Sequence, residues 1–177
     1  MKNLLKLLSP FAPDQSGASA VLYELGGLMV ICDAGGCAGN VCGFDEPRWF
    51  TKKSAVFSAG LRDMDAILGR DDRLIEKLSK ACEQISPAFT AIIGTPVPAV
   101  IATDMRALRR MAEKKTGLPC ITAECTGTNY YDSGSEPVWI ELFKTFATES
   151  KPVQKGRLGI IAVSYTHLRA HETLSDL

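Results

Sequence analysis

The chain has 177 residues, which suits one ordinary α/β domain or one domain and the start of another. Its hydrophobic content of 46% and charged content of 23% exclude fibrous and disordered classes. Twenty basic and twenty acidic residues leave no net charge, so neither nucleic acid nor an anionic membrane is expected as a general partner. No run is apolar enough for a membrane helix or a signal peptide. We therefore expect a cytoplasmic protein whose six cysteines are thiols or metal ligands.

The first predicted elements are a helix over 14–26 and a strand over 28–31. Asp14 or Ser16 is placed to cap the start of this helix, and a pair of glycines follows its end. The strand is a continuous apolar run, as in sheets that are covered on both faces. It leads into Cys32-Asp-Ala-Gly-Gly-Cys37-Ala-Gly-Asn-Val-Cys42, which we call the cysteine segment (residues 32–42).

Strands and helices continue to alternate along the rest of the chain. The predicted strands are 53–58, 88–94 and 118–123, and the predicted helices are 71–85, 95–117 and 137–147. In the second of these helices Thr95 is the expected cap and Pro96 the first helical residue. This order predicts an α/β fold with a doubly wound, mainly parallel, Rossmann-like sheet. Ligands of such sheets bind at the carboxyl ends of the strands, which lead here into the loops 33–47, 94–98 and 124–134.

The apolar and polar pattern also predicts domain boundaries. Residues 1–150 form the first domain, and 151–162 are a polar linker and the first strand of a second, truncated domain. Residues 163–177 resemble the translation of a transposon-end sequencing adapter, and we expect them to be an artefactual tail. Both histidines, His167 and His171, lie in that tail, so histidine catalysis and histidine-ligated zinc are not expected.

The cysteine segment is the strongest candidate site. Cys32, Cys37 and Cys42 bring soft ligands together on a glycine-rich backbone that can fold round a bulky group, as an iron–sulfur cluster requires. Their spacing fits no standard ferredoxin pattern, and each is alternatively a buried core thiol. The candidate cofactor-binding glycines are Gly35, Gly36 and Gly39, which also resemble half of a dinucleotide fingerprint. Of the other cysteines, Cys82 and Cys120 are predicted core residues, and Cys125 is expected near the site without a role.

Five segments in one order resemble the nitrogenase component 1 family. They are Pro13-Asp14-Gln-Ser-Gly-Ala18, Gly35-Gly36-Cys37, and the segments 61–74, 95–104 and 118–127. The resemblance implies that Cys37 is a cluster ligand and that Asp14 stands at a second ligand position, where chlorophyll reductases of this family also have aspartate. The third ligand position falls on Pro96, which cannot ligate. Either Cys32 or Cys42 replaces it, or the cluster is shared across subunits, or no cluster is present.

The same resemblance implies an oxidoreductase subunit of the nitrogenase component 1 type that is inactive as this piece alone. Its expected cofactor is an iron–sulfur cluster of the 4Fe-4S type. Its expected partners are a homologous subunit and an ATP-dependent iron-protein reductase. Two alternatives remain: a cofactor-assembly scaffold of the same family, and a non-redox α/β module that binds a nucleotide or another small molecule.

Overall fold

A four-stranded parallel sheet organises the chain. The structure, a computed structural model, describes residues 12–51 and 54–147. Within them the strand order is β2-β1-β3-β4, with all three pairings parallel. The strands are β1 (Leu28–Ile31), β2 (Ala55–Ser58), β3 (Thr90–Ile93) and β4 (Cys120–Ala123). The predicted fold class is thereby confirmed. Because β2 and β3 lie on opposite sides of β1, the topological switch point falls between β1 and β3.

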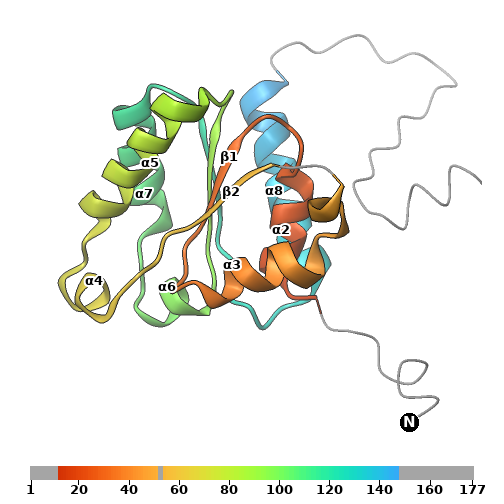
Figure 1. The fold of residues 1–177 in the computed structure, drawn as a ribbon, viewed down its shortest axis with the longest axis horizontal. Coiled ribbons are helices and arrows are strands. Elements are labelled where there is room, and N and C mark those ends of the chain that lie inside the picture. Colours follow the sequence, from red (N-terminus) through yellow and green to blue (C-terminus); the bar gives the residue numbers. More distant parts are fainter. Residues whose placement is uncertain (1–11, 52–53, 148–177) are drawn as a thin grey trace, which may run out of the picture.

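Helices cover both faces of the sheet (Figure 1). On one face lie α2 (Asp14–Leu22) and α8 (Tyr131–Phe146), and on the other lie α5 (Asp71–Ile85) and α7 (Met105–Thr116). Shorter elements occupy the connections, and they are α3 (Gly36–Asn40), the π-helix η1 (Val41–Asp45), the 3-10 helix η2 (Pro47–Phe50), α4 (Asp63–Leu68) and α6 (Pro96–Val100). In Figure 1, α3 and α6 lie at the lower edge of the sheet, where the strands end.

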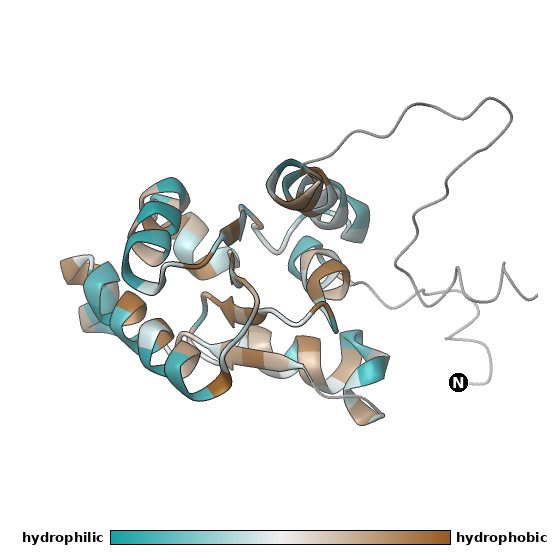
Figure 2. Cartoon of the chain, turned by 90° about the horizontal axis from the view of Figure 1, so that it is seen from above, coloured by the Kyte–Doolittle hydropathy of each residue, from teal (hydrophilic) through white to brown (hydrophobic). Residues whose placement is uncertain are grey.

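Successive side chains of each strand point to opposite faces of the sheet, so the protein has two separate hydrophobic cores. Met29 and Ile93 face α2 and α8, whereas Val30 and Ile92 face α5 and α7. Figure 2 shows the fold from above, with helices on both sides of the sheet. The strands are therefore continuous apolar runs because both of their faces are buried.

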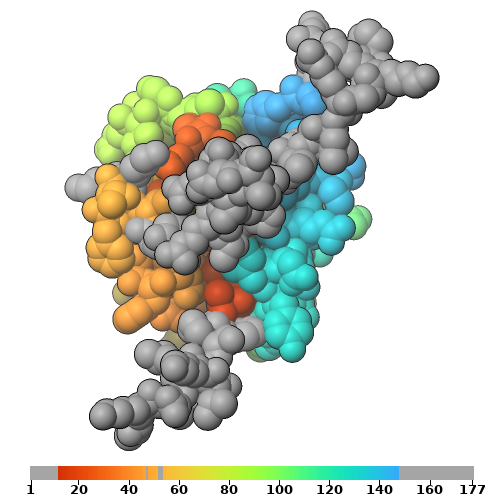
Figure 3. All heavy atoms as spheres, turned by 90° about the vertical axis from the view of Figure 1, so that its right-hand side faces the viewer, coloured from red at the N-terminus to blue at the C-terminus, as the bar shows by residue number. Residues whose placement is uncertain are grey.

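The contact between α2 and α8 depends on two glycines. An added methyl group at Gly17 would overlap the Tyr131 carbonyl, and one at Gly134 would overlap the Asp14 carbonyl. The two backbones can approach this closely because neither residue has a Cβ. On the face seen in Figure 3, α2 lies between the segment 36–50 and the start of α8. This packing holds the first turn of α2 at the carboxyl edge of the sheet.

Three predicted helices have different bounds in the structure. The helix predicted over 14–26 ends at Leu22. The helix predicted over 95–117 is divided into α6 and α7, because Ala102 adopts a left-handed φ of 54° and Asp104 starts a new helix by accepting hydrogen bonds from the amides of residues 106 and 107. Val100, one of the apolar residues in the range of that predicted helix, is 84% exposed. The last helix begins at Tyr131 and not at Pro137, which lies inside it.

The predicted cap of the first helix is also wrong. Its N-cap is Pro13, without a capping side chain, and Asp14 is the first helical residue.

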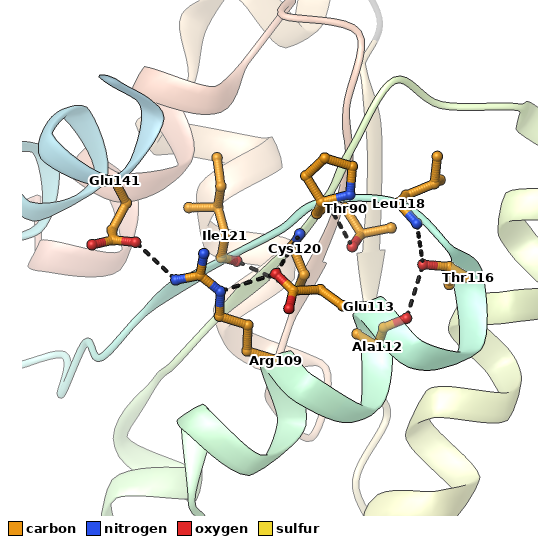
Figure 4. Close-up of polar contacts among 10 residues, drawn as sticks. Thr90, Arg109, Ala112, Glu113, Thr116, Leu118, Cys120, Ile121 and Glu141 are labelled. Atoms are coloured by element: carbon orange, nitrogen blue, oxygen red, sulfur yellow. Dashed lines mark hydrogen bonds and ion pairs between the residues drawn. The ribbon is translucent and has the colours of Figure 1, made fainter. Parts of the chain in front are cut away.

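A polar network ties α7 to α8 and β4 (Figure 4). The Arg109 guanidinium donates to Glu141 on α8 at 2.8 Å and to Glu113 at 3.1 Å, and Glu113 accepts from the Cys120 amide at 3.3 Å. The sequence pattern indicates that the basic residues of this helix form a solvated face. The half-buried Arg109 departs from that pattern because Glu141 from the neighbouring helix faces it.

Some predictions lie outside the described residues. These are the linker and strand of the second domain (151–162), the artefactual tail (163–177) and the first residue of the strand predicted over 53–58. Within the described ranges, no helix combines the length and apolar character needed to cross a bilayer.

Candidate metal site at the carboxyl edge of the sheet

The candidate site lies at the switch point between β1 and β3. Cys32 follows β1 and Thr95 follows β3, and the Thr95 hydroxyl donates to the Cys32 carbonyl at 2.8 Å. The three loops predicted to leave this edge do so, after β1, β3 and β4. The bond between Thr95 and Cys32 links the ends of the neighbouring strands β1 and β3 at this edge. This is where doubly wound sheets bind their ligands.

Cys37 lies at this edge in the first turn of α3 and is half-buried. Burial, and then the nearby Asp33 carboxylate, raise the pKa of the Cys37 thiol, while a hydrogen bond with Thr95 opposes this effect. The thiol is therefore protonated at neutral pH, and binding a metal would release its proton. Of the predicted ligands in the cysteine segment, Cys37 is the one whose thiol lies beside Thr95.

Asp33 organises this part of the cysteine segment. It is buried, its Oδ2 accepts from the Ala38 amide at 2.7 Å, and its Oδ1 accepts from the Ser58 hydroxyl at 2.6 Å. The carboxylate thus connects the turn that holds Cys37 to the end of β2. We did not predict this role, although a single acid in the loop just beyond a buried strand is a signal that points to it.

The other two cysteines of the segment lie in different surroundings. Cys32 is 2% exposed in the core under α5 and α7, and burial raises the pKa of its thiol to about 12. It borders a cavity of about 160 Å³ that is lined by α4, α5 and the α6–α7 connection. Cys42 is half-buried in η1, where burial and the Glu46 carboxylate raise its pKa.

Glu46 and Arg48 fasten the region around Cys42 to α2. Both carboxylate oxygens of the buried Glu46 accept from the guanidinium at 2.7 Å. The same guanidinium donates to the Ala20 carbonyl at 2.7 Å and lies over the Tyr23 ring, 4.8 Å from its centroid. The pair follows a π-helical turn, a rare conformation that is enriched at functional sites.

Asp14, the fourth predicted ligand, is 2% exposed at the start of α2. Its carboxylate accepts from the amides of Thr126 and Gly127, each at 2.8 Å, and from the Gln15 amide at 2.9 Å. Pro96 lies on the other side of Gly127, so the positions of Asp14 and Pro96 meet at the loop after β4. The structure brings this pair to the same edge as Cys37.

The glycines of the cysteine segment have open space around them. Gly35 has a positive φ of 121°, but a Cβ added at Gly35, Gly36 or Gly39 would meet nothing within 4 Å. These residues open the five-residue helix α3, which is too short for a strong helix dipole. Their predicted cofactor-binding role stays a prediction.

The remaining cysteines behave largely as core residues. Cys120 is fully buried, as predicted, and Cys82 is half-buried. Cys125 is buried next to a cavity of about 410 Å³ between the α6–α7 connection and the loop after β4. Burial raises the pKa of its thiol to about 12.

The described residues do not by themselves complete a metal site. No three His, Cys, Asp or Glu side chains within the described ranges are grouped closely enough to hold a metal ion. The Cys32 side chain lies in the core between the sheet and helices α5 and α7, and the Asp14 carboxylate already accepts hydrogen bonds from backbone amides. Among the predicted ligands, Cys37 is the one whose thiol is partly exposed and lies at the switch point.

Fold and site define the class: a doubly wound parallel α/β domain with a thiol at the switch point. The chain belongs to the nitrogenase component 1 type oxidoreductases, whose family model matches residues 14–175. It is 28% identical over 130 residues to the nitrogenase iron-molybdenum cofactor biosynthesis protein NifE of Klebsiella pneumoniae, a match that covers 66% of this chain.

Two solved structures share the fold. They are nitrogenase Cp1 at pH 5, with a TM-score of 0.62, and nitrogenase Cp1 at pH 6.5, with a TM-score of 0.65. Each is 18% identical and covers 82% of this chain. The chain spans 26% of the length of the curated relative, and 32% and 30% of the two structures.

Proposed function

We propose that this chain is part of a cytoplasmic, nitrogenase-like oxidoreductase subunit that binds an iron–sulfur cluster, of the 4Fe-4S type, jointly with a homologous partner subunit. The enzyme would relay electrons from an ATP-dependent iron-protein reductase to a substrate. The observation that carries the proposal is Cys37, a half-buried thiol at the switch point of a domain from this family. Thiolate ligation is what such clusters require.

Incomplete ligation within the chain supports a shared cluster. Cys37 would supply one thiolate, and the remaining ligands would come from the partner. The loops around the edge expose large apolar side chains, with Phe44 in η1 and Val100 in α6 each 84% exposed. Exposed apolar groups of this size are typical of interaction surfaces. A partner subunit seated on them would cover the thiol and exclude water from the cluster.

A second candidate function is a cofactor-assembly scaffold, which holds a cluster without turning over a substrate. The match to the cofactor biosynthesis protein NifE favours it. A reductase-linked enzyme would show ATP-dependent reduction of the bound cluster when the iron-protein reductase is added. A scaffold would instead transfer its cluster to an apo-acceptor protein, and these two results separate the candidates.

Anaerobic purification of the full chain with its partner subunit tests the shared proposal. We expect a coloured protein with iron and acid-labile sulfide in equal amounts and an EPR signal on reduction. The variant Cys37→Ser should lose this signal, whereas Cys82→Ser, a half-buried thiol on α5, is the matched control and should keep it. A colourless, metal-free complex would refute the proposal.

A further inference from the structure

The carboxylate of Asp14 already holds a loop. Two backbone amides of the loop after β4 donate to it at 2.8 Å, one to each oxygen, and the Gln15 amide donates at 2.9 Å. The Thr126 hydroxyl and the Asn129 side-chain amide add longer contacts of 3.4 and 3.5 Å. A carboxylate offers about four acceptor positions, so this one is saturated. Binding iron would leave buried amides without an acceptor.

Pro96 holds the same loop from the other side. Gly127 adopts a φ of 76°, and a Cβ added there would lie 2.5 Å from Pro96 Cγ and 3.2 Å from Gln15 Oε1. That oxygen is buried and has no hydrogen-bond partner among the described residues. Asp14, Pro96, Thr126 and Gly127 thus join α2, α6 and the loop after β4, and we call them the loop clamp.

From this geometry we infer that the chain offers one thiolate, Cys37, to a metal centre at this edge, and that Asp14 is a positioning residue that closes the edge and not a ligand. The metal-binding half of the inference rests on the proposed function, whereas the clamp does not. Cys32 is excluded because its thiol lies in the core under α5 and α7. Cys42 is excluded because it lies in η1, which packs against α2, α3 and η2 and is fastened to α2 through Glu46 and Arg48.

Three variants of the full chain test the inference: Asp14→Asn, Gly127→Ala and Cys37→Ser. Each is combined with the partner subunit and treated anaerobically with ferrous iron and sulfide, and iron per folded complex is measured. Hydrogen exchange at the amides of residues 126 and 127 is followed in parallel without metal. In Asp14→Asn the amide oxygen can accept from one loop amide, but the NH2 group faces the other. We expect exchange at least about tenfold faster there, since this corresponds to the loss of one hydrogen bond, with iron per folded complex unchanged.

Gly127→Ala opens the clamp without altering the carboxylate, so it should show the same fast exchange and the same iron content if Asp14→Asn fails to fold. Cys37→Ser should show the opposite pattern, with iron lost and exchange unchanged. Loss of iron in Asp14→Asn with normal exchange would make Asp14 a ligand and overturn the inference. If the unaltered chain binds no iron together with its partner subunit, the proposed function fails, and the exchange rates still decide whether the clamp exists.

Discussion

Replacing Arg48 by methionine should destabilise the protein and loosen the region around Cys42. The guanidinium makes two 2.7 Å bonds to Glu46, whose residue is 3% exposed, and a third bond of the same length to the Ala20 carbonyl. Arg48→Met keeps much of the side-chain length that covers the Tyr23 ring. It therefore removes the charge and the donors with little loss of packing.

The magnitude follows from the charge left behind. Removing one partner of a buried ion pair costs about 3–5 kcal/mol, because the other charge is left without compensation. The Arg48 side chain is 27% exposed, so water can reach part of the pair, and we expect about 2–3 kcal/mol. For a domain of this size that lowers the Tm by roughly 5–10 °C. Glu46→Gln in the Arg48→Met background removes the orphaned charge, so this double variant should be more stable than Arg48→Met alone.

Urea unfolding of the two single variants and the double variant measures these free energies and the coupling between the residues. Alkylation of Cys42 at pH 8 provides an independent readout. Glu46→Gln removes the neighbouring charge that raises the Cys42 pKa, so the thiolate becomes easier to form and alkylation should be faster. The idea that this ion pair fastens the region around Cys42 would be refuted by either of two results. One is a loss of less than about 0.5 kcal/mol in the free energy of unfolding of Arg48→Met. The other is strictly additive effects of the two substitutions in the double-mutant cycle.

Two further predictions concern titration. Alkylation of the native protein, followed by peptide mass spectrometry, should modify the half-buried Cys37 well before the buried Cys32. Because the Cys37 pKa is raised, its alkylation rate should still be rising above pH 9. Equal rates for the two cysteines would contradict the placement of the two thiols. The Glu141 pKa is lowered, first by its hydrogen bond with Arg109, so the folded state binds protons less readily than the unfolded state and the stabilisation is lost as pH falls below the usual glutamate range. Glu141→Gln should therefore unfold with a shallower pH dependence in acid, and an unchanged slope would argue against this ion pair.

Local pattern was sufficient for much of the fold. The strand predicted over 28–31 and the helix predicted over 71–85 have the predicted bounds, because a continuous apolar run and a one-sided helical face each report on burial directly. The division between α6 and α7 was missed, although Asp104 is a good cap residue. The apolar residues at 97, 100 and 101 fit one continuous helical pattern with those of α7. Ala102 interrupts that helix with a left-handed backbone conformation, and an alanine gives no sign of this in the sequence.

The sequence by itself determined the sheet, its two buried faces and the position of the cysteine segment after the first strand. These follow from the apolar period and from the order of elements, both of which are local properties. Only the tertiary structure decided which of the candidate ligands share an edge. Cys32 and Cys37 are five residues apart, yet the Cys32 thiol lies in the core under α5 and α7 and the Cys37 thiol lies beside Thr95. Asp14 binds amides more than a hundred positions away, and no local pattern reports a contact across such a distance.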